Sequence, residues 1–136
     1  MFGKKNQPPI KSLIAQGTRI EGNMKFTEGL RVDGEVYGDI QASPEDAGSL
    51  LVISEASVVQ GAIQADHVII NGTVRGPVHA RELLELQPKA RIEGDVSYIA
   101  LEMHQGATIS GQLRPLVAGA AGEEDKPLLK LAAKSA

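Results

Sequence analysis

Apolar residues in this chain flank a glycine in a five-residue motif, apolar-x-Gly-x-apolar, that recurs six times. The first residues of successive pentads lie 16, 23, 15, 18 and 17 positions apart. A repeat near 17 residues with one insertion predicts a solenoid, in which each repeat buries its apolar face against the next. The six pentads are Ile20-Glu21-Gly22-Asn23-Met24, Val36-Tyr37-Gly38-Asp39-Ile40, Val59-Gln60-Gly61-Ala62-Ile63, Val74-Arg75-Gly76-Pro77-Val78, Ile92-Glu93-Gly94-Asp95-Val96 and Ile109-Ser110-Gly111-Gln112-Leu113.

Two further columns of residues keep the register of the pentads. An apolar-x-apolar motif falls between them, as Leu30-x-Val32, Leu51-x-Ile53, Val68-x-Ile70, Leu84-x-Leu86 and Leu101-x-Met103. A small residue is expected at the corner before each pentad, in the series Gly17, Gly34, Ala56, Gly72, Ala90 and Gly106. Because three independent columns share one spacing, the repeat is a structural one.

The apolar positions alternate with polar ones, which is the period of a strand and not of a helix. Coils of about 17 residues are too short for a βα repeat but suit three short strands around a triangular core. We therefore predict an all-β fold, a single-stranded parallel β-helix of about six coils stacked about 4.8 Å apart. The pentad glycine serves a tight corner or supplies a positive φ. The expected structural core is Val36, Ile40, Val59, Ile63, Val74, Val78, Ile92 and Val96.

One alternative fold and two local irregularities need comment. A left-handed hexapeptide solenoid would have coils of about 18 residues with a repeat at every sixth position, and no such hexad persists here. The segment Gln41–Ser49 lengthens one coil and predicts a corner loop, either a tolerated surface insertion or a partner-binding loop. Pro77 lacks an N–H and is expected at a bend.

The sequence divides into a disordered N-terminal tail (1–15), a β-helix domain (16–116) and a disordered C-terminal tail (117–136). The first residues, Met1, Phe2, Lys4 and Lys5, combine apolar and cationic side chains. They form either a solubilising tail or a membrane-binding peptide, since buried Phe contributes about 1.5–3 kcal/mol and each Lys near anionic lipid about 1 kcal/mol. The C-terminal Leu128–Leu131 stretch is disordered or a docking peptide.

The composition and charge of the chain argue against several classes of site and function. The chain has no Cys, which excludes disulfides and thiolate metal sites. No apolar run approaches the roughly 18–20 residues of a membrane span, so we expect a cytosolic protein. A net charge of −3 without a basic patch argues against nucleic-acid binding. The chain has only two Phe and two Tyr, which suits a narrow solenoid.

No pattern of catalytic or metal-ligating residues emerges. His67, His79 and His104 follow their corner residues by 11, 7 and 14 positions, so they occupy different columns and should not share a metal ion. There is no Ser/His/Asp or Cys/His arrangement and no phosphate-binding loop. We therefore expect no catalytic residue, no metal, no cofactor and no nucleotide. The mixed outward column that begins with Glu21 and Tyr37 indicates a solvated face.

With these three columns, a Met-Phe-x-Lys start and disordered tails, the chain resembles the bactofilins, a bacterial family of polymer-forming cytoskeletal proteins. The resemblance covers 16–116 and is most specific at 32–40 and 92–96. It implies a right-handed β-helix that assembles end to end into filaments without nucleotide. It also implies peripheral attachment to the cytoplasmic face of the inner membrane through the Met-Phe start. The expected partners are further copies of the chain, that membrane and cell-wall enzymes, in a role in cell shape.

The ends of a β-solenoid supply a physical reason to polymerise, because their backbone edges are open and their apolar rungs uncovered. The expected polymer interface comprises Ile20, Met24, Ile109, Leu113 and Leu116. Some bactofilins carry phenylalanine in the final coil, where this chain has Thr108-Ile109. Contacts between like ends would give a filament without polarity. The alternatives are a non-polymerising β-solenoid adaptor and a left-handed solenoid enzyme of the acyltransferase or carbonic anhydrase type.

Overall fold

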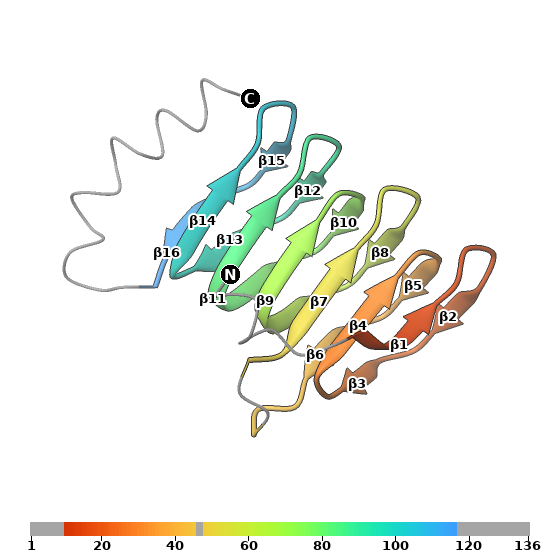
Figure 1. The fold of residues 1–136 in the computed structure, drawn as a ribbon. Helices are drawn as coiled ribbons and strands as arrows, with labels where there is room; N and C mark the ends of the chain where they lie inside the picture. The colour runs from red at the N-terminus through yellow and green to blue at the C-terminus, as the bar shows by residue number, and fades with distance from the viewer. Residues whose placement is uncertain (1–9, 46–47, 117–136) are drawn as a thin grey trace.

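The computed structural model describes residues 10–45 and 48–116 as a stack of short strands (Figure 1). These residues contain no helix, and so none that is long and apolar enough to cross a membrane. The strands are β1 (Ile10–Ile14), β2 (Arg19–Glu21), β3 (Met24–Phe26), β4 (Gly29–Val32), β5 (Glu35–Tyr37), β6 (Ile40–Ala42), β7 (Leu50–Ile53), β8 (Val58–Gln60), β9 (Ile63–Ile70), β10 (Thr73–Arg75), β11 (Val78–Leu86), β12 (Arg91–Glu93), β13 (Val96–Tyr98), β14 (Ala100–Met103), β15 (Thr108–Ser110) and β16 (Leu113–Pro115).

The strands build six coils, numbered here 1 to 6 from the N-terminus, each with one strand on each of three faces. The first face is β1-β4-β7-β9-β11-β14, the second is β2-β5-β8-β10-β12-β15 and the third is β3-β6-β9-β11-β13-β16. The long strands β9 and β11 pass from the third face of one coil to the first face of the next. All the pairs are parallel, which confirms the predicted parallel β-helix of about six coils.

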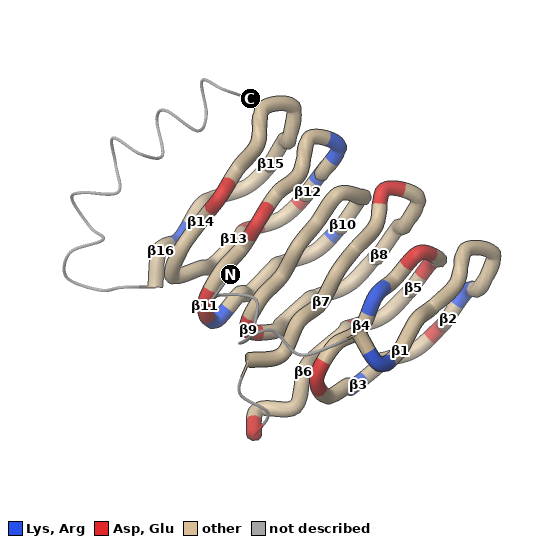
Figure 2. The backbone as a smooth tube through the Cα atoms, viewed as in Figure 1, with Lys and Arg blue, Asp and Glu red and all other residues tan. Residues whose placement is uncertain are grey.

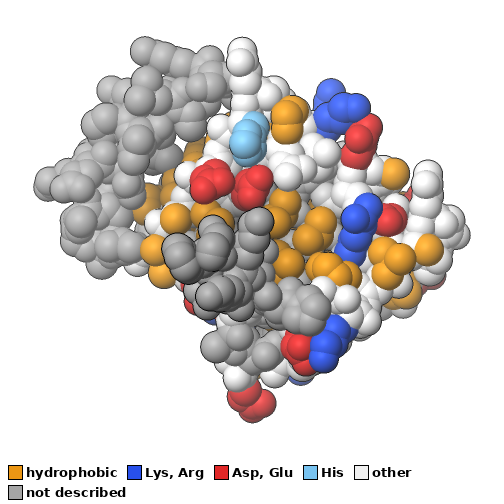
Figure 3. All heavy atoms as spheres, in the orientation of Figure 1, with side chains coloured by type: hydrophobic (Ala, Val, Ile, Leu, Met, Phe, Trp, Pro, Cys, Tyr) orange, Lys and Arg blue, Asp and Glu red, His pale blue; other side chains and the backbone are white. Residues whose placement is uncertain are grey.

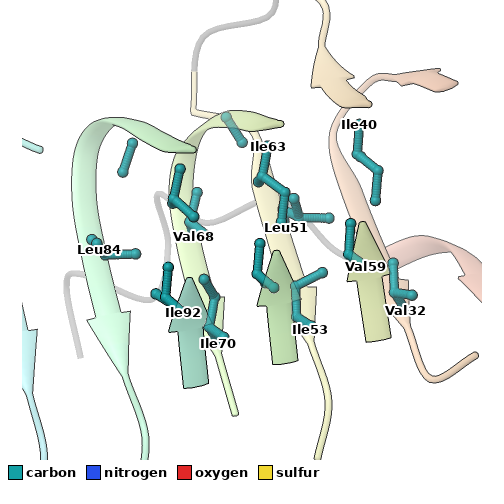
Figure 4. Packing of buried hydrophobic residues seen from close by; sticks show 14 of the residues in the cluster. Val32, Ile40, Leu51, Ile53, Val59, Ile63, Val68, Ile70, Leu84 and Ile92 are labelled. Carbon is teal, nitrogen blue, oxygen red and sulfur yellow. The ribbon is translucent and has the colours of Figure 1, made fainter. Parts of the chain in front are cut away.

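The interior of the helix is formed by the predicted apolar columns (Figure 4). Strand pairing aligns Val36 with Ile20 and Val59 on the second face, and Ile40 with Met24 and Ile63 on the third. Every residue of the predicted structural core has at most 1% of its surface exposed. These residues are Val36, Ile40, Val59, Ile63, Val74, Val78, Ile92 and Val96.

The pentad glycines meet both of the requirements that the sequence left open. Gly38, Gly61, Gly76 and Gly94 all have positive φ, between 152° and 155°. A Cβ added at any of them would clash with the carbonyl oxygen of the pentad glycine one coil earlier. The column therefore needs glycine for its backbone conformation and for the close stacking of successive coils.

The predicted corner column is wrong at Gly17, Ala56 and Gly106, which are exposed and lie one residue too early. Glu35 pairs with Val58, so the residues before them, Gly34 and Ser57, occupy the same position in successive coils. Corners between the first and second faces have two residues in coils 2 and 4 but four elsewhere. The prediction failed in coils 1, 3 and 6 because their four-residue corners carry another Gly or Ala one position before the true column. The buried small residues of this column are Gly34, Ser57, Gly72, Ala90 and Ala107.

The β-helix also begins earlier than the predicted boundary at residue 16. Residues Ile10–Ile14 form β1, which pairs with β4 and supplies the first face of coil 1. The strand was missed because Ser12, and not an apolar residue, aligns with Leu30, and only Ile14 is buried. The two predicted tails lie largely or wholly outside the described residues.

The two local irregularities fall where the sequence placed them. The coil that contains Gln41–Ser49 is lengthened between β6 and β7, at the corner between the third and first faces. Pro77 lies between β10 and β11, at a bend and not within a strand. Its carbonyl accepts a hydrogen bond from the N–H of Ile63, 2.9 Å away.

Candidate assembly interface

The N-terminal end of the β-helix exposes part of its apolar interior. Coil 1 points Ile20 and Met24 inward, and both are only partly buried against the core. The residues paired with them in coil 2, Val36 and Ile40, are fully buried. The difference arises because Val36 and Ile40 have a coil on each side, whereas Ile20 and Met24 have a coil on one side only.

The C-terminal end repeats this arrangement on coil 6. Ile109 and Leu113 point inward and are partly buried, while Ile92 and Val96, their partners in coil 5, are at most 1% exposed. Leu116 follows β16 and is 39% exposed. The structure thus places the five predicted interface residues on the two terminal coils, in two groups at opposite ends of the helix.

Backbone groups at both ends also lack a neighbouring strand. Within the described residues, β2 pairs only with β5, and β15 pairs only with β12. No helix covers either terminal coil in this part of the chain. An open strand edge beside uncovered apolar side chains favours the addition of further strands.

Several charged side chains at the ends are paired within the chain. Coil 1 carries ion pairs between Arg19 and Glu21 and between Lys11 and Glu28, each at 3.2 Å. At the other end, the Arg114 guanidinium lies 3.3 Å from a carboxylate oxygen of Asp95. Exposed pairs of this kind contribute little to stability. Their opposite charges nevertheless lower the repulsion between two like ends.

Three terminal residues were not among the predicted interface residues. Leu101 and Met103 of β14 are partly exposed in the same way as Ile109, and they pack against the core. Phe26 of β3 is 8% exposed at the N-terminal end. Leu101 and Met103 could have been found from the sequence, because they form the last member of the apolar-x-apolar column.

The histidines do not converge on one site. His67 lies on β9 with its Nε2 3.8 Å from Glu82, His79 lies on β11, and His104 follows β14. The ligand atoms of Glu85, Glu102 and His104 do lie within 4.8 Å of one another, close enough to hold a metal ion. Glu102 and His104 are exposed, however, and surface groups commonly lie this close without an ion.

The end of the lengthened corner loop is anchored by a buried carboxylate. Asp66 is 6% exposed and accepts hydrogen bonds from the N–H groups of Gly48 and Ser49, the latter at 3.2 Å. Its carboxylate also lies 2.7 Å from the guanidinium of Arg81. These contacts fix the loop to the body of the helix, and they leave both interpretations of it open. The predicted membrane-binding residues Met1, Phe2, Lys4 and Lys5 lie outside the described residues.

Comparison with known proteins gives one consistent result. The family model named Bactofilin, described as polymer-forming cytoskeletal, matches residues 12–114. Bactofilin BacO of Myxococcus xanthus (strain DK1622) is 28% identical over 112 residues, which are 82% of this chain and 85% of BacO. Bactofilin BacP of the same organism is 26% identical over 102 residues, or 75% of this chain. That match spans only 40% of BacP. No solved structure matches the chain.

Proposed function

This chain belongs to the bactofilin family of polymer-forming cytoskeletal proteins, and we propose that it assembles end to end into filaments without bound nucleotide. In this proposal it is a structural protein and not an enzyme. The match spans less than half the length of BacP, so the activity of the whole protein is part of the proposal.

The observation that carries the proposal is the contrast between terminal and middle coils. The inward residues Ile20, Met24, Ile109 and Leu113 are partly exposed, whereas their equivalents in coils 2 to 5 are at most 1% exposed. Covering them with a second molecule would remove apolar surface from water, at about 25 cal/mol per Å². The same contact would pair the open strand edges.

The geometry of the ends is compatible with a filament without polarity, which is the arrangement we propose. Contact between two N-terminal ends, or between two C-terminal ends, is isologous and uses one surface twice. Because the two ends lie on opposite sides of the stack, alternating contacts of these two kinds extend the chain of molecules indefinitely. Nucleotide is not required for either contact, since both rest on apolar burial and strand pairing.

We further propose where the filament lies and what it does. Met1, Phe2, Lys4 and Lys5 would hold it at the cytoplasmic face of the inner membrane, as their apolar and cationic side chains suit that surface. There it would organise cell-wall enzymes and influence cell shape. The family resemblance supports this part of the proposal.

Negative-stain microscopy of the purified full chain, without nucleotide, tests the proposal. We expect long unbranched filaments. A protein that remains monomeric at high concentration would support the adaptor alternative, and discrete small oligomers would support the solenoid enzyme alternative. Either result would contradict end-to-end assembly.

A further inference from the structure

The first face carries an outward column whose chemistry changes along the stack. Strand pairing aligns its members from coil 1 to coil 6 in the order Leu13, Arg31, Val52, Ile69, Glu85 and Glu102. The N-terminal part is apolar and basic, the middle is apolar and the C-terminal part is acidic. Figure 2 shows this separation of charge along the first-face strands. Figure 3 shows hydrophobic side chains gathered between the two charged regions.

Among the residues that the structure describes, no Lys or Arg is ion-paired with the acidic part of this column. Glu85 and Glu102 are directly paired on β11 and β14, and like charges in that position destabilise a sheet. Within the described residues their only ion pair is the 3.4 Å contact between Glu85 and His104, which is charged only when the histidine is protonated. A cation from another molecule would therefore find an uncompensated site here.

From this column we infer that the first face pairs with the first face of a second copy in the antiparallel direction. The two-fold axis lies in the interface, parallel to the strands and between coils 3 and 4. Coil n then faces coil 7 − n, so Val52 faces Ile69 of the second copy. The same rotation sets Arg31 opposite Glu85, and Leu13 opposite the side chain of Glu102. Apolar side chains thus meet in the middle, with opposite charges on both sides of them. Arg31 lies 2.9 Å from Asp33 of its own chain, so in the paired faces it would be shared between that carboxylate and Glu85.

The neighbouring positions on the face are compatible with this rotation. The adjacent column contains Gly29, Leu50, His67, Leu83 and Ala100. Gly29 and Leu50 are buried within the chain, whereas His67, Leu83 and Ala100 are at least partly exposed. Coil pairing sets Leu50 opposite His67 and Gly29 opposite Leu83, so no like charges meet there. The four-residue corners of coils 3 and 5 also face the two-residue corners of coils 4 and 2.

The size of the face predicts when pairing occurs. Six coils of about 4.8 Å and strands of about four residues give a face of roughly 29 Å by 13 Å. That is about half of the roughly 800 Å² per partner in a stable complex. Isolated molecules should therefore pair weakly. Two filaments present many such faces in register and should pair strongly through avidity, which makes the inference rest on the proposed end-to-end assembly.

Engineered cysteines test the contact because the natural chain has none. We expect Val52→Cys filaments to form covalent dimers with a short bis-maleimide reagent. Gln60→Cys, also in coil 3 but on the second face, is the matched control and should not crosslink. Coil 3 lies about five coil spacings, or roughly 24 Å, from its equivalent across an end contact, so end-to-end neighbours are out of reach.

Charge exchange tests the antiparallel direction. Arg31→Glu should reduce crosslinking of Val52→Cys several-fold, and the double change Arg31→Glu with Glu85→Arg should restore it. Arg31 is half exposed, and circular dichroism would show that each variant remains folded. Absence of crosslinking in normal filaments, or crosslinking that Arg31→Glu leaves unchanged, would overturn the inference and leave end-to-end assembly intact. Crosslinked dimers at high concentration without filaments would instead support face pairing and contradict the end contact.

Discussion

At the scale of single residues, the pentad glycines make the closest contacts between coils. Gly61 has a φ of +152°, and a Cβ at this position would collide with the carbonyl oxygen of Gly38. Gly22 has a φ of +131°, but no atom lies within 4 Å of its added Cβ because no coil precedes it in the described chain. Substitutions at these two glycines therefore distinguish the cost of backbone strain, which both share, from the steric cost of stacking, which applies only to Gly61.

We predict that Gly61→Ala destabilises the domain more than Gly22→Ala does. Both substitutions force alanine into a positive-φ conformation, which costs on the order of 1–3 kcal/mol. Only Gly61→Ala also pushes two coils apart. Thermal denaturation followed by circular dichroism would measure the difference as a lower midpoint for Gly61→Ala. Equal midpoints would show that the coils accommodate the added methyl group at Gly61 without loss of stability.

We predict that Val74→Asp unfolds the domain. Val74 has no exposed surface and pairs with Val59 and Ile92 in the coils on either side. An unpaired carboxylate there would cost several kcal/mol, a large part of the stability of a domain this size. Thr73→Asp, one residue earlier and facing outward, is the control and should retain the fold. A cooperative transition of Val74→Asp near the wild-type temperature would contradict the inward position of this column.

At the scale of elements, the strands were predictable except β1, and the corners were not. A strand can be predicted from the alternation of apolar and polar residues. Leu84 pairs with Val68 and Leu101, as the spacing of the apolar-x-apolar motifs in the sequence indicates. Corner length carries no such periodic signal. The short corners of coils 2 and 4 contain Gly34 and Gly72, whose absent side chains let the backbone approach the preceding coil closely. That approach is a contact between coils, which a single repeat does not contain.

A ladder of side-chain hydrogen bonds links the bends that follow the pentad glycines. Asn23 Oδ1 accepts from the N–H of Asp39, and Asp39 Oδ1 accepts from the N–H of Ala62, both at 2.9 Å. The ladder has a gap at the next step, where Ala62 offers no acceptor and Pro77 has no N–H to donate. At this step Ala62 has no side-chain acceptor to satisfy and Pro77 needs none, which explains how proline is tolerated in the stack.

We predict that Asp39→Ala lowers stability by about 0.5–1.5 kcal/mol, because it removes the acceptor for the N–H of Ala62. Asp39→Asn is the matched control, since an amide oxygen fills the same role at Asn23. Urea denaturation would measure both variants. If Asp39→Asn were as destabilised as Asp39→Ala, the charge and not the hydrogen bond would be the important property.

At the scale of the whole molecule, the apolar residues at the two ends can be predicted from the repeat, but the molecule that would cover them cannot. Ile20, Met24, Ile109 and Leu113 could be predicted because they are the first and last members of the pentad columns. Their partial exposure shows that apolar surface remains uncovered in one molecule. In the proposed filament a second molecule covers it, and such a contact between chains is contained neither in the sequence nor in the structure of one chain.

We predict that Ile109→Arg or Leu113→Arg abolishes filaments and leaves a folded small oligomer. A guanidinium at the terminal rung opposes apolar contact and repels its own symmetry mate, yet it disturbs the packing of one coil only. Ser110→Arg adds the same charge to β15 but faces outward, so it should still polymerise. Negative-stain microscopy and sedimentation would compare the three variants. Normal filaments from both Ile109→Arg and Leu113→Arg would show that the filament contact is not made by this end.

We predict that deletion of Phe2–Lys5 releases the protein from anionic liposomes without affecting filaments. These residues precede Pro8-Pro9 and β1, so we expect the coils to stack without them. They combine the apolar and cationic groups that suit a membrane surface. Each copy binds weakly, and a filament multiplies that binding. A polymer-blocked Ile109→Arg variant should therefore also leave the membrane, although its tail is intact. Added salt should weaken the lysine contribution and spare that of Phe2. Cosedimentation decides the matter, because equal lipid binding with and without the peptide would make Met1–Lys5 an ordinary solubilising tail.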